Sequence, residues 1–202
     1  IYAPTLSVMS TTGAEDSAIA LAINAALVDN DGSETLSINI SGVPIGSTLS
    51  AGINNGNGTW TLTPAQLSGL TFMPPLNTDG QFNLSVTAYS SENGTTASST
   101  GSVGINVAGV ATAPNLSVTP STGSEDTQIQ LAIAASLADT DGSETLSIVI
   151  GNVPTGGSLS AGTNNGNGTW TLTPAQLSGL TFTPPLHASG SYSLSVTAIS
   201  SE

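Results

Sequence analysis

The chain is an internal duplication. Residues 1–92 align without a gap to residues 111–202, and 63 of the 92 aligned positions are identical. The offset of 110 residues matches the length of one small domain, whereas the units of solenoid proteins span about 20–50 residues. The duplication therefore predicts two domains of the same fold, residues 1–110 and residues 111–202.

Each repeat is predicted to consist of β-strands. Apolar residues alternate with small or polar ones in several short runs, for example at Ile19, Leu21 and Ile23, which is typical of strands with one buried face. In the second copy Gln128 and Gln130 replace alanines at outward positions, while the inward residues stay apolar. We expect strands at 5–9, 18–27, 36–41, 48–52, 59–63, 70–73, 81–89 and 101–108, and a single helical turn at 64–67.

Many short strands joined by tight turns predict an all-β fold, with an antiparallel β-sandwich in each domain. The Asn-Gly steps within residues 54–58 are typical of such turns, because Asn and Gly tolerate positive φ. The counterpart of the strand at 101–108 would fall near 211–218, beyond Glu202. We therefore expect the second domain to lack its final strand and to expose a sheet edge.

Carboxylates dominate the charge of the chain. The sequence has 13 acidic residues and no Lys or Arg, so its formal net charge is −13 and the carboxylates have no side-chain cation as partner. Crowded carboxylates repel one another unless solvent or a metal ion neutralises them. All but Asp79 form two sets that lie 110 residues apart. The sets are Glu15, Asp16, Asp29, Asp31, Glu34 and Glu92, and Glu125, Asp126, Asp139, Asp141, Glu144 and Glu202.

The crowding of these carboxylates into short loops predicts metal binding, and hard oxygen ligands favour Ca²⁺. The segment Asp-x-Asp-Gly-Ser-Glu, at 29–34 and 139–144, places two Asp on the same side of an extended segment and follows them with a glycine that permits a tight turn. It is not an EF-hand, because Ile40 stands where an EF-hand loop has its last glutamate. A solvated, solubilising surface is the alternative interpretation of the same loops.

The alternating direction of the strands predicts where the carboxylates lie. The loop of Glu15 and Asp16 should lie at one end of its sandwich, and the loop of residues 29–34 should lie at the other end with Glu92. If two domains stack end to end, the acidic loops of both domains meet at the junction, where calcium ions would be shared. The carboxylates expected there are Glu15, Asp16, Asp139, Asp141 and Glu144, with Asp79 and Glu202 as further candidates.

Three motifs of the second copy resemble the tandem extender domains of giant bacterial RTX adhesins. They are SEDT at 124–127, LADTDGSETL at 137–146 and GTWTLT at 168–173, and the similarity covers nearly the whole of both copies. The resemblance implies immunoglobulin- or cadherin-like Greek-key sandwiches, arranged end to end in long arrays and secreted by a type I system. It also implies that calcium rigidifies the junctions. The chain would then be a monomeric, extracellular spacer on the bacterial cell surface, with adjacent repeats of the same chain as its partners.

The composition argues against several other functions. The net charge disfavours nucleic acid and anionic membranes, and no apolar run reaches the roughly 20 residues that span a bilayer. No enzyme activity and no small-molecule substrate are expected, because the chain has no Lys, Arg or Cys and a single histidine, His187, which we place in a surface loop. The remaining alternative is a glycan- or protein-binding module. In such a module Trp60 and Trp170 could stack on sugars, although their inward-facing strand positions favour packing in the core.

Overall fold

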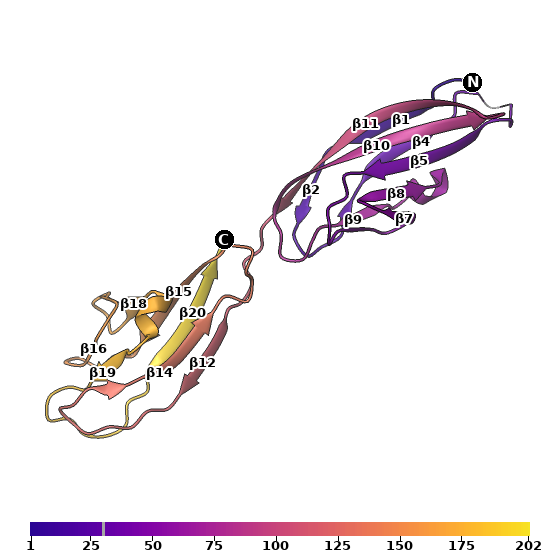
Figure 1. Cartoon of the computed structure of the whole chain (residues 1–202). Helices are drawn as coiled ribbons and strands as arrows, with labels where there is room; N and C mark the ends of the chain where they lie inside the picture. The colour runs from indigo at the N-terminus through magenta and orange to yellow at the C-terminus, as the bar shows by residue number, and fades with distance from the viewer. Residues whose placement is uncertain (30) are drawn as a thin grey trace. The chain divides into compact units, whose positions relative to one another are not determined.

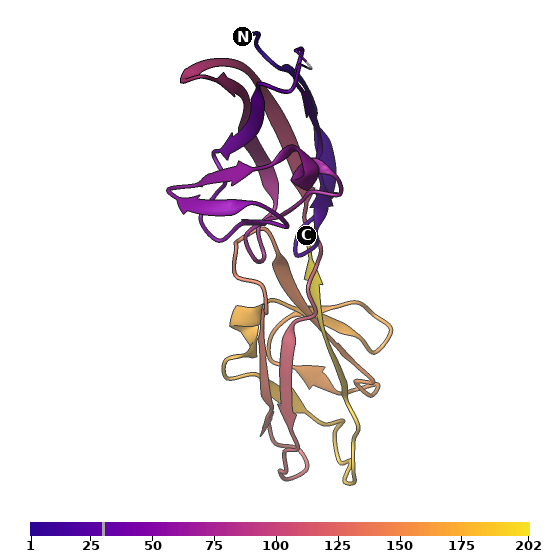
Figure 2. The same ribbon diagram turned by 90° about the vertical axis from the view of Figure 1, so that its right-hand side faces the viewer.

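The computed structural model describes residues 1–29 and 31–202, which divide into two compact units, Ile1–Val110 and Ala111–Glu202. We call them unit 1 and unit 2; Figure 1 labels most of their strands, and Figure 2 shows the same strands from the side. Unit 1 contains β1 (Thr5–Met9), β2 (Thr11–Ala14), β3 (Ile19–Ala20), β4 (Ala22–Ala26), β5 (Thr35–Ser41), β6 (Thr48–Leu49), β7 (Ile53–Gly56), β8 (Thr59–Leu62), the 3₁₀ helix η1 (Pro64–Leu67), β9 (Thr71–Met73), β10 (Gly80–Glu92) and β11 (Thr95–Ala108). Unit 2 contains β12 (Asn115–Thr119), β13 (Ile129–Gln130), β14 (Ala132–Ser136), β15 (Thr145–Gly151), β16 (Ser158–Leu159), β17 (Thr163–Asn164), β18 (Trp170–Leu172), the 3₁₀ helix η2 (Pro174–Leu177), β19 (Thr181–Thr183) and β20 (Ser195–Ser201).

Unit 1 is a sandwich of two β-layers. One layer is a sheet in the order β2-β11-β10-β5-β8-β7, and the other consists of β1 paired with β4 and of β3-β9-β6. The N-terminal segment is divided between the layers, because β1 pairs antiparallel with β4 whereas β2 pairs parallel with β11. This strand order is that of an immunoglobulin-like sandwich. The predicted all-β, immunoglobulin-like fold is confirmed.

The core of unit 1 lies between the two layers. Alternate residues of β5 and β10, such as Ile38, Ile40, Leu84 and Val86, are fully buried, as the period of two predicts. Trp60 of β8 belongs to the same core cluster and is 9% exposed. The indole of unit 1 therefore packs inside the sandwich.

The structure adds two strands of unit 1 that the sequence analysis did not predict. β7 lies within the segment that was expected to be a turn; the turn itself is confined to Asn57 and Gly58, whose φ angles of 53° and 71° suit a two-residue hairpin loop. β2, with the sequence TTGA, has no apolar alternation and pairs with the edge of β11. The predicted helical turn at 64–67 is present, and the side chain of Gln66 accepts a hydrogen bond from the Thr63 amide at 2.9 Å.

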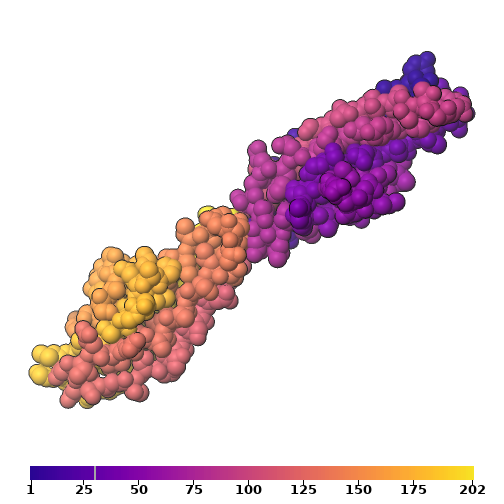
Figure 3. Space-filling model, viewed as in Figure 1, coloured from indigo at the N-terminus to yellow at the C-terminus, as the bar shows by residue number. Residues whose placement is uncertain are grey.

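Unit 2 repeats this arrangement without a counterpart of β11. Its strands pair in the orders β12-β14, β13-β19-β16 and β17-β18-β15-β20, so β20 lies at a sheet edge. Residues 121–124, which correspond to β2, form no strand. In unit 1, by contrast, β11 covers this side, and the surface of the β10–β11 hairpin runs along the length of the sandwich (Figure 3).

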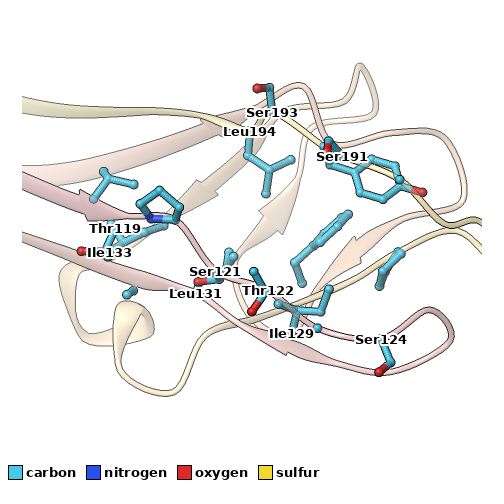
Figure 4. Close-up of a pocket in the computed structure, with 18 of the residues that line it drawn as sticks. Thr119, Ser121, Thr122, Ser124, Ile129, Leu131, Ile133, Ser191, Ser193 and Leu194 are labelled. Carbon is cyan, nitrogen blue, oxygen red and sulfur yellow. The ribbon is translucent and has the colours of Figure 1, made fainter.

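The sheet edge that the sequence predicts in the second repeat is the side of β20 that has no partner among the described strands. Next to β20, Figure 4 shows Leu194 and Ile129 on opposite sides of a hollow that both residues line.

Candidate metal centre

The acidic residues of unit 1 lie at its two opposite ends. Glu15 lies at the end of β11, where its amide donates to the carbonyl oxygen of Ala108 at 2.9 Å and its Oε1 accepts from the amide of Val110 at 2.6 Å. Asp16 lies beside it, and its Oδ1 accepts from the amide of Asn77 at 2.8 Å. The connection that carries Asp79 therefore reaches the same end.

Residues 31–34 lead into β5 at the other end of the sandwich. Thr35, the first residue of β5, pairs with Ser91 of β10, and Glu92 follows as the last residue of that strand. Glu92 is half-buried, and it pairs with Thr95 across the β10–β11 hairpin. The register thus separates Glu34 and Glu92 from Glu15 by the full length of β10 and β11.

The two aspartates of each Asp-x-Asp-Gly-Ser-Glu segment organise their own loop. Oδ1 of Asp29 accepts from the Asp31 amide at 3.2 Å, and Oδ1 of Asp31 accepts from the amide and the hydroxyl of Ser33 at 2.8 Å and 2.5 Å. Unit 2 has the same bonds, at 2.9 Å between Asp139 and Asp141 and at 2.8 Å and 2.6 Å from Ser143 to Asp141. One oxygen of each aspartate is thereby engaged in a local turn.

Replacing Ser33 by Ala should raise the pKa of Asp31 towards its ordinary value of 3.8, because the Ser33 hydroxyl and then the Ser33 amide hold this pKa below that value. A pKa that is lowered by folding contributes stability above the unfolded-state pKa, and this contribution is lost as the pH falls through the folded-state pKa. A pH titration of the carboxyl carbons by NMR would measure the shift. Asp141, whose pKa Ser143 lowers in the same way, is the internal control; an unchanged pKa of Asp31 would contradict the assignment.

A buried glutamate attaches each loop to the segment that leads into its unit. Glu34 and Glu144 are 7% and 6% exposed. Oε1 of Glu34 accepts from the Tyr2 amide at 3.3 Å, and Oε1 of Glu144 accepts from the Thr112 amide. We call these two contacts the glutamate latches.

A serine on the strand opposite completes each latch. The hydroxyl of Ser90 donates to the carbonyl oxygen of Tyr2 at 2.5 Å, and the hydroxyl of Ser200 donates to that of Thr112 at 2.5 Å. Each latch residue lies 110 positions from its counterpart in the other copy. The leading segment is therefore held through both the amide and the carbonyl group of one residue in each copy.

The second oxygen of each latch glutamate has no hydrogen-bond partner among the residues that the structure describes. These oxygens are Oε2 of Glu34 and Oε2 of Glu144. Oδ2 of the buried Asp139 likewise has no hydrogen-bond partner among the described residues. A buried carboxylate oxygen without a donor is costly unless a cation neutralises it. The all-oxygen donor set of these loops, with carboxylates, hydroxyls and carbonyls, fits the preference of Ca²⁺.

Carboxylates alone do not assemble a coordination shell within one unit. Over the part of the chain that the structure describes, no three acidic side chains of the same unit offer oxygens within 4.8 Å of one another. Ca²⁺ takes about 6–8 oxygen ligands. An ion bound at one latch would therefore need backbone carbonyl oxygens and water besides the carboxylates.

The other predicted ligands differ between the copies. Glu15 is buried, whereas Glu125, its counterpart in unit 2, is exposed like Glu202. Asp126 has a basic partner, which corrects the expectation from the sequence: Nδ1 of His187 lies 3.1 Å from its Oδ2, and the His187 amide donates to its Oδ1 at 2.6 Å. His187 is exposed, in agreement with the predicted surface loop.

Sequence reasoning missed the partners of the latch glutamates. Tyr2 and Thr112 take part through backbone atoms, and Ser90 and Ser200 are two of many serines in the chain. Every residue except proline has a backbone amide, so the sequence does not indicate which amide will bind the glutamate. The one available clue was that both serines recur at the same place in the two copies.

Comparisons with known proteins return domains of immunoglobulin-like type at low similarity. The sequence matches no protein-family model, and no curated protein shows significant similarity to it. Among solved structures, murine CEACAM1b has 15% identity and a TM-score of 0.29, with 84% of this chain and 85% of that chain covered. The D00-D0 domain of intimin has 14% identity and a TM-score of 0.29, with 96% and 91% covered. The titin domains z1z2 in complex with telethonin have 10% identity and a TM-score of 0.32, with 98% and 94% covered.

Similarities of this size carry no argument about function, so the fold assignment rests on the strand order and registers described above. Among the described residues, no helix has the length and hydropathy that spanning a membrane would require.

Proposed function

We propose that the chain is a pair of spacer repeats from the stalk of a bacterial cell-surface adhesin, of the RTX extender type, and that Ca²⁺ binds to its acidic loops. The observation that carries this proposal is the glutamate latch, which occurs in both copies with the same partners. Each latch joins an acidic loop to the segment through which the chain leads into the unit. An ion bound there would fix that segment to its sandwich.

Electrostatics supports a cation at the latch. The chain has no lysine or arginine to offset the repulsion between the carboxylates of these loops, and its net charge is −13. Glu34 and Glu144 each keep a buried oxygen to which no described residue donates. Ca²⁺ suits such loops better than Mg²⁺, because Mg²⁺ demands near-ideal octahedral geometry and gives up its water reluctantly.

The fold supports a spacer over a glycan-binding module. Two domains in series that share 63 of 92 aligned positions provide length, as repeated spacer units do. Trp60, the best sugar-stacking candidate of unit 1, belongs to the core. By restraining the leading segment of each unit, calcium would limit bending between successive repeats and project distal adhesive domains from the extracellular side of the cell surface.

The calcium proposal predicts that chelation lowers the melting temperature. An ion that binds only the folded state adds about RT ln(1 + [L]/Kd), or about 2.7 kcal/mol per site at a hundredfold excess over Kd. Calorimetry in EDTA, in Ca²⁺ and in Mg²⁺ should show a large stabilisation by Ca²⁺ and a small one by Mg²⁺. Equal melting in Ca²⁺ and EDTA would refute calcium binding.

A charge-matched pair of variants tests the latch itself. Glu34→Gln should remove most of the calcium-dependent gain of unit 1, since it neutralises the buried carboxylate. Asp79→Asn removes one charge from an exposed loop of the same unit and should keep the full gain. If both variants respond to calcium equally, the ion does not bind at the Glu34 latch.

A further inference from the structure

The sequence NNGNGTW occurs twice in the chain, at 54–60 and at 164–170. Each copy contains two Asn-Gly steps. An asparagine that precedes glycine can lose its side-chain amide group spontaneously, because glycine has no Cβ atom to shield the backbone nitrogen that attacks the asparagine. Since the two copies are identical, any difference in their reactivity within the folded chain must come from the fold.

The reaction uses only groups of the chain and water. The glycine nitrogen forms a bond to Cγ of the asparagine, the bond from Cγ to Nδ2 breaks, and ammonia leaves with the proton of the glycine amide. The product is a five-membered succinimide ring. Water then opens the ring at either of its two carbonyl carbons and gives aspartate or isoaspartate. A glycine amide that already donates a hydrogen bond is a poor nucleophile in this reaction.

The first Asn-Gly step of each copy is protected by hydrogen bonds. Its glycine amide donates to the side-chain oxygen of the asparagine two positions earlier, and the side chain of its own asparagine donates to a threonine hydroxyl. The bonds are Gly56 to Asn54 at 2.9 Å and Asn55 to Thr61 at 2.8 Å in unit 1, and Gly166 to Asn164 at 2.9 Å and Asn165 to Thr171 at 3.1 Å in unit 2.

The second Asn-Gly step differs between the copies. Neither the Gly58 amide nor the Gly168 amide donates to a group among the described residues. In unit 1 the hydroxyl of Thr59 donates to the carbonyl oxygen of Gly56 at 3.0 Å. In unit 2 the corresponding hydroxyl of Thr169 donates instead to Oδ1 of Asn167 at 2.6 Å. Oδ1 is the oxygen on which negative charge develops when the glycine nitrogen attacks Cγ.

The backbone around the second step differs as well. Asn57 lies in a two-residue loop that the strand pair Gly56↔Thr59 closes. In unit 2, β17 ends at Asn164 and β18 begins at Trp170, so the exposed Asn167 lies in the middle of a longer loop. Closing the succinimide ring requires the asparagine backbone to rotate until the glycine nitrogen faces Cγ. The strand pair resists this rotation in unit 1, and no strand pair encloses Asn167 as tightly.

We propose that Asn167 is a site of spontaneous deamidation in the folded protein, with the Thr169 hydroxyl stabilising the charge that develops on Oδ1. A donor that is already in place at a developing oxyanion lowers the barrier, as in the oxyanion holes of enzymes. The reaction requires neither calcium nor a role as a spacer. It adds one negative charge to unit 2 and, where isoaspartate forms, one methylene group to the backbone. Two repeats with the same local sequence thereby become chemically different as the protein ages.

The test compares the two copies within the whole chain at neutral pH. Chymotrypsin, which cleaves after Leu and Trp, releases peptides 50–60 and 160–170, and mass spectrometry distinguishes them because Ile53 corresponds to Thr163. Asn167 should deamidate at least about tenfold faster than Asn57, the rate effect of one hydrogen bond to a developing charge. In urea the two rates should become equal. Equal rates in the folded chain, or a difference that persists in urea, would overturn the inference.

Variants of the two threonines test the role of the hydroxyl. Thr169→Val removes the hydroxyl but retains the branched shape, so deamidation of Asn167 should slow about tenfold in the folded chain and stay unchanged in urea. Thr169→Ser retains the hydroxyl and should keep the fast rate. Thr59→Val is the matched control, because the Thr59 hydroxyl donates elsewhere, and it should not slow Asn57. A Thr169→Val chain that deamidates as fast as the original, or a Thr169→Ser chain that deamidates as slowly as Thr169→Val, would contradict the proposed role.

Discussion

Replacing Trp60 by Ala is expected to destabilise unit 1 by about 3–5 kcal/mol, the range for truncating large buried aromatic side chains. Trp60 lies on β8, which pairs with β5 at Ile40, and its indole is part of the main core cluster. The variant removes the indole from between the layers and leaves a cavity that the rigid strands on both sides cannot close. Urea denaturation followed by circular dichroism would measure the loss.

Two variants act as controls for Trp60→Ala. Trp60→Phe retains most of the apolar area and should cost much less. Trp170→Ala changes the corresponding residue of unit 2, which is half-buried, and should cost less than Trp60→Ala. A Trp60→Ala protein of unchanged stability that loses binding on a glycan array would replace the spacer proposal by the glycan-binding alternative.

Replacing Gly58 by Ala is expected to destabilise unit 1 by about 2–5 kcal/mol, the sum of a conformational cost and a steric cost. The φ angle of Gly58 is 71°, and a Cβ atom in this left-handed region costs about 1–2 kcal/mol. The new Cβ would also lie 2.6 Å from the carbonyl oxygen of Val43, so the backbone must move, which costs about 1–3 kcal/mol as overpacking. Movement would strain the hydrogen bond from the Val43 amide to the Gly58 carbonyl, which is 3.1 Å long.

Neighbouring glycines separate the two causes. Gly56 has a φ angle of 81°, and a Cβ atom added there would meet no other atom within 4 Å, so Gly56→Ala should show the conformational cost of about 1–2 kcal/mol alone. Gly168, the counterpart of Gly58 in unit 2, has its nearest contact at 3.1 Å and should give an intermediate loss. Equal losses for Gly56→Ala and Gly58→Ala would contradict the role of the contact with Val43.

The strands and their buried faces could be predicted from local pattern. The period of two in 36–41 and 81–89 identified β5 and β10, because each inward position of a sandwich strand must be apolar. Pro64, with Thr63 before it as cap, predicted the 3₁₀ turn η1, and the same sequence recurs at η2. The gapless duplication predicted that both copies share one fold.

Contacts between distant segments decided the rest. β2 is a strand because β11 offers it a parallel edge, and the equivalent residues 121–124, of similar sequence, form no strand where that edge is missing. The glutamate latches join residues 32 positions apart through backbone amides, which every residue except proline carries. Side-chain pattern determines which face of a strand is buried, whereas backbone pairing depends on which other strand lies beside it, and that is decided by the assembled sandwich.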